Sequence, residues 1–135
     1  MKSALTSLLV VVLFIIAGCK KDKDAGPLSI SGEYKVYRVI IEDPDDGPQE
    51  TPVPLPNGDH STAIVTANAD SSMSVKVVYL NKDNVTIDEV TLTGQAKKIG
   101  NSLRFMDGNN WLGTFLDNAE VELYPDGVTT LYARK

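Results

Sequence analysis

From residue 29 to the C-terminus, apolar residues occur in short runs separated by turn-forming residues. No segment here repeats apolar residues at intervals of three and four, the spacing of an amphipathic helix. Alternation in the first run places Tyr34, Val36 and Ile40 on one face, with Val39 and Ile41 on the other. The pattern predicts an all-β domain with eight strands, at residues 30–42, 62–69, 73–81, 85–93, 102–106, 111–116, 120–124 and 128–134.

Most links between these strands are short and rich in Gly, Asp and Asn, as at residues 81–83, 107–110 and 125–127. Such residues tolerate the positive φ that tight turns require, and we expect Gly94, Gly100, Gly108 and Gly127 at turns. Short links join neighbouring antiparallel strands. The sequence therefore predicts an eight-stranded antiparallel up-and-down barrel, with a two-sheet β-sandwich as the alternative.

One link is much longer. Residues 43–60 are predicted to lack helix and strand because prolines recur along them, and loops of this length are often functional. The acidic start of this segment resembles a calcium loop only superficially, since its oxygen ligands do not fall at EF-hand positions. The prolines are Pro44, Pro48, Pro52, Pro54 and Pro56.

The N-terminus carries a different pattern. Lys2 precedes an unbroken apolar run at residues 8–16, too short for a transmembrane helix but typical of a signal peptide. The run ends at Ile16-Ala17-Gly18-Cys19, which resembles the lipobox of bacterial lipoproteins. The resemblance implies cleavage between Gly18 and Cys19 and acylation of the Cys19 thiol, so that lipid chains such as palmitate hold the protein on a membrane. The expected organisation is a signal peptide at 1–18, a lipidated cysteine and charged linker at 19–28, and one domain at 29–135.

Charge and composition narrow the partners. The chain has a net charge of −5, which argues against nucleic acid as a partner. Its single cysteine, Cys19, leaves no disulfide. The alternating lysines and aspartates of residues 20–24 look like the export tags of Bacteroidota surface lipoproteins, although a solvated tether has the same composition. We therefore expect attachment to the outer membrane, on its periplasmic or cell-surface face.

The two ends of the domain carry a second resemblance. Gly32-Glu33-Tyr34 resembles the Gly-x-Trp opening of lipocalins and their bacterial relatives, with Tyr34 in place of Trp. In that family an arginine of the last strand packs over the first-strand ring, a role that the resemblance gives to Arg134. It also implies a cup that holds one small hydrophobic ligand, covered by residues 43–60 as a lid.

Catalytic chemistry finds little support. His60 is the only histidine, so no nucleophile–histidine triad can form, and we read it as a solvent-exposed residue. Glu120 and Glu122 share a face that is most simply the solvated one. The sequence predicts a non-enzymatic protein without metal or cofactor. Trp111 begins a strand, so it could stack on a ligand at the barrel mouth or simply pack there. The alternative function is contact with a protein or glycan partner.

Overall fold

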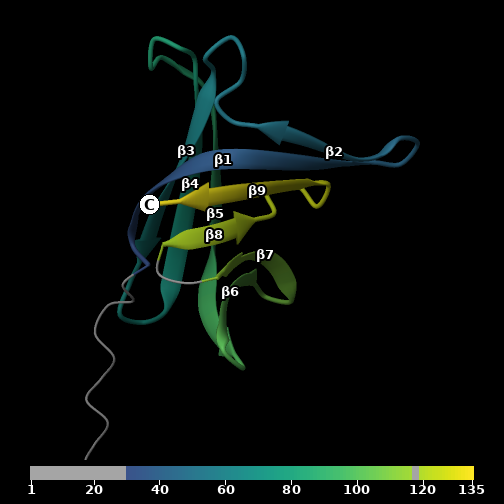
Figure 1. The fold of residues 1–135 in the computed structure, drawn as a ribbon. Coiled ribbons are helices and arrows are strands. Elements are labelled where there is room, and N and C mark those ends of the chain that lie inside the picture. The colour runs from purple at the N-terminus through teal and green to yellow at the C-terminus, as the bar shows by residue number, and fades with distance from the viewer. Residues whose placement is uncertain (1–29, 117–118) are drawn as a thin grey trace, which may run out of the picture.

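The computed structural model describes residues 30–116 and 119–135, and these form nine strands. The predicted signal peptide, the linker, Gly18 and Cys19 lie outside the described residues. The strands are β1 (Gly32–Asp43), β2 (Gly47–Pro52), β3 (His60–Ala67), β4 (Ser72–Leu80), β5 (Thr86–Ile99), β6 (Ser102–Asp107), β7 (Asn110–Phe115), β8 (Glu120–Leu123) and β9 (Thr129–Arg134). Figure 1 shows β1, β9 and β8 in front of β3, β4 and β5.

All the strand pairs are antiparallel, and β3 to β9 follow one another around the sheet in chain order. Strand β1 pairs with β3 on one side and with β9 on the other, which closes the ring. The predicted eight-stranded up-and-down barrel is confirmed, with β2 as an additional strand. The two-sheet sandwich is wrong, because a sandwich would leave β1 and β9 unpaired.

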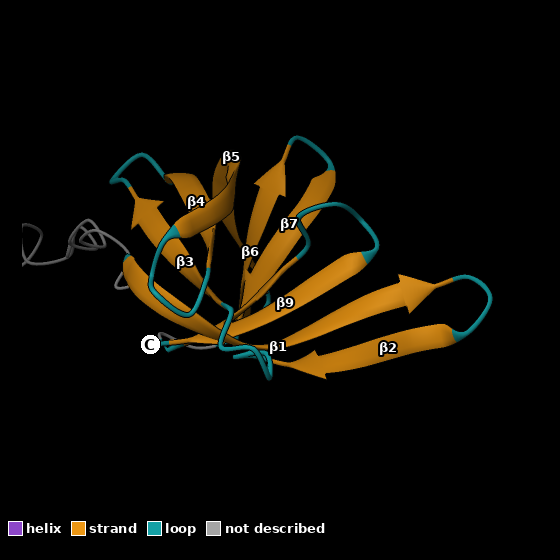
Figure 2. Cartoon of the chain, turned by 90° about the horizontal axis from the view of Figure 1, so that it is seen from above, coloured by secondary structure: helices purple, strands orange, loops and turns teal. Residues whose placement is uncertain are grey.

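Strand β1 pairs with three other strands because it is long and bends. Its first residues pair with β3, and from Arg38 the same edge pairs with β2 instead. The pairing with β9 shifts between Val36 and Arg38, a β-bulge that adds one residue to β1. Val36 and Val39 therefore face the interior, whereas strict alternation placed them on opposite faces. Figure 2 shows the β1–β2 hairpin projecting away from the barrel.

The interior is filled by alternate residues of every barrel strand, as the period of a strand requires. Strands β3 and β4 contribute mainly small and β-branched residues, and β6, β7 and β8 contribute larger ones. The fully or almost fully buried residues include Tyr34, Ala63, Val65, Val75, Val77, Phe105, Phe115, Val121, Leu123, Leu131 and Ala133.

The existence of β2 corrects the expectation that residues 43–60 hold no strand. Pro48 and Pro52 lie opposite Glu42 and Arg38. Proline cannot donate a ladder hydrogen bond, but an edge strand uses only one of its two sides. Val53 donates its N–H to the carbonyl of Tyr37, so the backbone N–H and C=O groups of odd-numbered residues point toward β1. The backbone nitrogens of Pro48 and Pro52 point the other way, toward the free edge. Proline excludes a central strand, and the prediction wrongly extended this to an edge strand.

Gly94 also differs from its predicted place in a turn, because it lies within β5. A Cβ atom built on Gly94 would stand 2.3 Å from the carbonyl oxygen of Met106. Glycine is needed here for the close approach of β6. The predicted end of this strand at residue 93 was therefore too early, and β5 continues to Ile99.

Candidate functional site

An apolar pocket of about 340 Å³ opens at one end of the barrel. It lies where β1 ends, β3 begins and β4 turns into β5, and the segment after β2 forms one side of it. We call it the apolar pocket. Its lining residues are Val39, Ile41, Thr51, Val53, Leu55, Asp59, His60, Ser61, Tyr79, Leu80 and Ile87.

The bulge in β1 positions one wall of this pocket. Because the bulge restores the inward direction at Val39, the next inward residue is Ile41, and both line the pocket. Ile41 keeps 46% of its surface exposed and Ile87, across the pocket on β5, keeps 61%. Exposed large apolar side chains that share a hollow are typical of binding surfaces.

The link between β2 and β3 forms another wall. Leu55 donates its N–H to the Asp59 carbonyl and accepts from Gly58, which closes a compact turn. Val53 and Leu55 both line the apolar pocket, so part of the predicted lid segment does border a cavity. It lies beside the cavity as a wall, while residues 43–50 run outward in the β1–β2 hairpin (Figure 2).

Tyr79 supplies a polar group within this apolar lining. Burial raises the pKa of its phenol, and the carboxylates of Asp126 and Asp88 raise it further. The hydroxyl is therefore protonated at neutral pH and can donate a hydrogen bond. His60 also lines the pocket, with Nδ1 3.2 Å from the carbonyl oxygen of Gly58. The sequence did not single out Tyr79, because an aromatic residue in a strand is usually core.

The opposite end of the barrel is closed around Tyr34, which is completely buried. Its hydroxyl donates to the Ile30 carbonyl at 2.6 Å, and the Phe115 ring meets it edge-on at 6.3 Å. Gly32, with φ of +140°, brings the chain in beside it. Tyr34 and Gly32 thus lie at the closed end, where the family resemblance expected an aromatic residue.

The cation over Tyr34 is not the expected one. Lys135 places its Nζ 5.1 Å from the ring centroid, whereas Arg134 lies over Tyr37 at 4.8 Å. Ala133 points inward and is fully buried, so strand alternation directs Arg134 to the outer face. The prediction that Arg134 covers Tyr34 was wrong by one position.

Trp111 lies on the outer face of the barrel and does not line the apolar pocket. An extra residue in β7, Leu112, opposite Phe105 and Met106, directs it outward, where its indole N–H donates to the Gly113 carbonyl at 2.8 Å. The guanidinium of Arg104 lies 4.4 Å from its ring centroid. Of the two interpretations of Trp111, ligand stacking at the mouth is not supported, because its partners are those of a packed surface residue.

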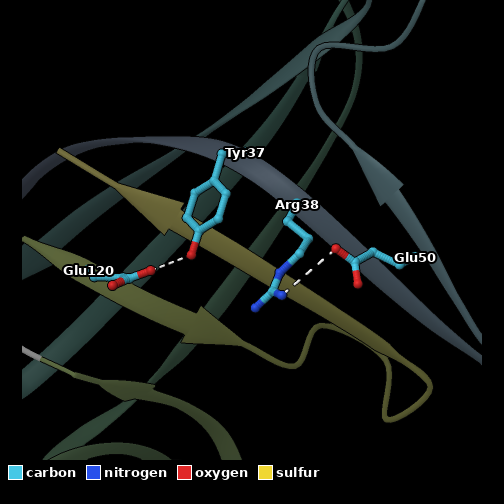
Figure 3. Close-up of polar contacts among 4 residues, drawn as sticks. All are labelled: Tyr37, Arg38, Glu50 and Glu120. Carbon is cyan, nitrogen blue, oxygen red and sulfur yellow. Dashed lines mark hydrogen bonds and ion pairs between the residues drawn. The ribbon is translucent and has the colours of Figure 1, made fainter.

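Trp111 belongs to a surface that runs across β6 to β9 and β1, which we call the arginine–aromatic face. Arg38 stacks on Tyr132 with 3.9 Å between guanidinium carbon and ring centroid, and the Tyr37 hydroxyl donates to Glu120. Figure 3 shows Tyr37 reaching Glu120 while Arg38 points to Glu50. The face comprises Tyr37, Arg38, Arg104, Trp111, Tyr124, Tyr132 and Arg134.

The polar groups of this face are held in place by their neighbours. Burial, together with a hydrogen bond to Glu122, raises the pKa of Tyr124 to about 12. The Nε atoms of Arg38 and Arg104 are buried without a hydrogen-bond partner among the described residues. Stacking on Tyr132 and Trp111 offsets part of that cost, since a cation–π contact contributes about 0.5–1 kcal/mol. Glu120 and Glu122 lie on this outer face, as alternation predicted.

Metal-ligating side chains do not cluster among the described residues. Nowhere in residues 30–116 and 119–135 do three or more His, Cys, Asp or Glu side chains gather as metal ligands would. The same residues contain no helix with the length and apolarity needed to span a membrane. No protein-family model, curated protein or solved structure matches the chain. The function must therefore be argued from the geometry of the barrel.

Proposed function

We propose that this protein is a lipid-anchored, non-catalytic binding protein that holds a small hydrophobic molecule in the apolar pocket. The observation that carries the proposal is a hollow of about 340 Å³ lined mainly by aliphatic side chains at one end of a closed barrel. Ligand pockets usually occupy about 300–1,000 Å³ and combine apolar walls with a few polar groups. Tyr79, Ser61 and His60 supply such groups here.

The energetic argument concerns the aliphatic residues at the rim. Ile41, Leu55 and Ile87 expose 46%, 36% and 61% of their surface in the empty barrel. Apolar surface removed from water stabilises a complex by about 25 cal/mol per Å². A small apolar ligand would cover these side chains together, which no neighbouring strand does.

A charge placed in the pocket tests this proposal. We expect Ile41→Asp to weaken binding of the fluorescent apolar probe N-phenyl-1-naphthylamine at least about tenfold, because the carboxylate must be desolvated by the ligand. Ile64→Asp is the matched control, since Ile64 is exposed to 42% but lies on the outer face of β3. Circular dichroism melting verifies that both variants fold. A probe that does not bind, or that both substitutions affect equally, would contradict the proposal.

The anchor is the second part of the proposal and rests on the N-terminal sequence. The lipobox-like residues 16–19 follow an apolar run of signal-peptide length, and Cys19 is the only cysteine. Two or more acyl chains on one residue suffice for stable membrane attachment. We propose the outer membrane as the location, on its periplasmic or cell-surface face.

The arginine–aromatic face supports a second candidate function, contact with a protein or glycan partner. Tyr, Trp and Arg are the residues enriched at binding hot spots, and here they form one connected surface. A photo-crosslinking amino acid at position 132 in intact cells tests it, with position 64 as control. A specific adduct from position 132 alone is expected, and identical patterns from both positions would contradict this function.

A further inference from the structure

A second, more polar pocket of about 400 Å³ lies against the barrel wall between β1 and β3. We call it the polar pocket. It shares three lining residues with the apolar pocket, namely His60, Ser61 and Leu80. The two hollows therefore adjoin, on either side of the start of β3. The polar pocket is lined by Glu33, Lys35, Val36, Pro54, His60, Ser61, Thr62, Leu80 and Asn84.

The wall between the two pockets is not a hydrogen-bonded ladder. Pairing of β1 with β3 ends at Lys35 and Thr62, and the bonds between β1 and the next segment begin with the Val53 N–H on the Tyr37 carbonyl. Residues 53–59 cross this interval. Val53 and Leu55 face the apolar pocket while Pro54, between them, faces the polar one. Side chains and the stretch 53–59 thus separate the two hollows at this point.

The charges at the polar pocket are balanced. Glu33 and Lys35 come from the outward side of β1, and neither forms an ion pair with another described residue. Thr62 and Asn84 add neutral groups that both donate and accept hydrogen bonds, and His60 adds its ring nitrogens. A free carboxylate would meet Glu33 as well as Lys35. A head group with one positive and one negative charge, or with no charge, avoids repulsion by both Glu33 and Lys35.

We propose that the natural ligand is amphipathic, with an aliphatic chain in the apolar pocket and a polar head of zero net charge in the polar pocket. This inference rests on the proposed function and specifies its ligand class. The chain would pass through the wall between β1 and β3, beside Ser61. Glu33 and Lys35 would select the head by charge, while Thr62 and Asn84 would hydrogen-bond it.

A series of ligands with one chain and different heads tests the selection. Isothermal titration below the micellar concentration compares dodecylphosphocholine, dodecanoate and dodecyltrimethylammonium. We expect dodecylphosphocholine to bind about tenfold more tightly than either charged ligand, as one or two added hydrogen bonds to charged groups would give. Equal affinities, or tighter binding of either charged ligand, would overturn the inference. N-phenyl-1-naphthylamine bound in the same samples would show that the proposed function survives that failure.

Filling the polar pocket gives the second arm of the experiment. Thr62 lines the polar pocket but not the apolar pocket. Thr62→Trp should therefore abolish the preference for dodecylphosphocholine. Binding of N-phenyl-1-naphthylamine should stay within about twofold of the unsubstituted protein. Ile64→Trp, two residues along the outer face of β3, is the control and should retain the preference. Loss of N-phenyl-1-naphthylamine binding in Thr62→Trp, or an unchanged head preference, would show that the two hollows are not used as proposed.

Discussion

Gly94 occupies a position in β5 that leaves no room for a side chain. An added Cβ would lie 2.3 Å from the Met106 carbonyl oxygen and 3.0 Å from the Phe105 ring. We expect Gly94→Ala to lower the free energy of unfolding by about 1–3 kcal/mol, the usual cost of overpacking, in urea denaturation. Gly100→Asn is the control, because Gly100 has φ of +60° and nothing within 4 Å of an added Cβ. Asparagine tolerates that φ, and an equal loss in the control would contradict this explanation.

Asp126 links stability to pH. Burial alone would raise the pKa of Asp126, but hydrogen bonds from the Thr129 hydroxyl and from the N–H groups of Val128 and Thr129 lower it overall. A lowered pKa stabilises the fold above the unfolded value of about 3.9, and this contribution is lost as pH falls through the folded-state pKa.

We expect Asp126→Ala to cost about 1 kcal/mol of unfolding free energy at neutral pH. The difference from the unsubstituted protein should shrink as the pH is lowered below about 4, because both proteins then lack the charge. Thermal melting followed by circular dichroism across this range measures it. A difference that stays constant with pH would mean that the carboxylate charge is not the cause.

The faces of Val39 and Trp111 differ from simple alternation for one physical reason. Alternation predicts the face of a residue only while the register is unbroken, and a bulge shifts it by one position. The extra residue after Val36 brings Val39 inward, and the extra residue Leu112 in β7 turns Trp111 outward. The bulge in β1 carries no glycine, and Gly113 beside Leu112 does not by itself distinguish a bulge from an ordinary strand position, so the sequence alone could not locate them.

Strand β2 ends the sheet with an edge that its prolines protect. Pro48, Glu50 and Pro52 face outward, so only Glu50 offers an N–H to an incoming strand. Exposed edges with free donors pair with other chains. We expect the double substitution Pro48→Thr, Pro52→Thr to cause concentration-dependent association in sedimentation velocity experiments. Pro56→Thr, outside the strand, should remain monomeric, as should the unsubstituted protein. Association of the Pro56→Thr variant would contradict the edge mechanism.

The sequence predicted some of the remaining elements better than others. Strands β3 and β4 alternate cleanly, with Ala63 and Val65 opposite Val77 and Val75, and the sequence predicted both. Strand β2 was missed because proline is acceptable only at an edge, and which edges are free depends on the whole fold. A cup bordered by the long loop was expected from the family resemblance, but its residues were not, since Ile87 joins the pocket only through the pairing of β5 with β4.

At the scale of the whole molecule, the pocket and the start of the domain lie at opposite ends of the barrel. The Ser31 hydroxyl accepts the Ala67 N–H at 2.9 Å, so the domain begins beside the end of β3. The apolar pocket lies at His60, the other end of that strand, roughly 23 Å away at 3.3 Å per residue. With the proposed anchor at Cys19, the tether would join the domain at its closed end.

We expect Cys19→Ser to abolish incorporation of labelled palmitate and to move the protein out of the membrane fraction. Replacing Lys20, Lys21 and Lys23 by alanine is the control, because it should leave acylation intact. Persistence of the label in Cys19→Ser would refute the proposed anchor.

A cysteine introduced at the exposed position 57 distinguishes the two faces of the outer membrane. Asn57→Cys should react with an impermeant maleimide in intact cells if the protein lies on the cell surface. Reaction only after the outer membrane is permeabilised would place it on the periplasmic face.

The pairing of β1 with β9 has a consequence for how the protein folds. Every other neighbouring pair in the ring from β3 to β9 can form from adjacent hairpins, but this one joins the two ends of the domain. Such non-local pairing loses loop entropy before the new contacts stabilise the structure. Domains rich in non-local β pairing fold in about milliseconds to seconds. Strand β1 is synthesised before β9, so the barrel cannot close until β9 has been made.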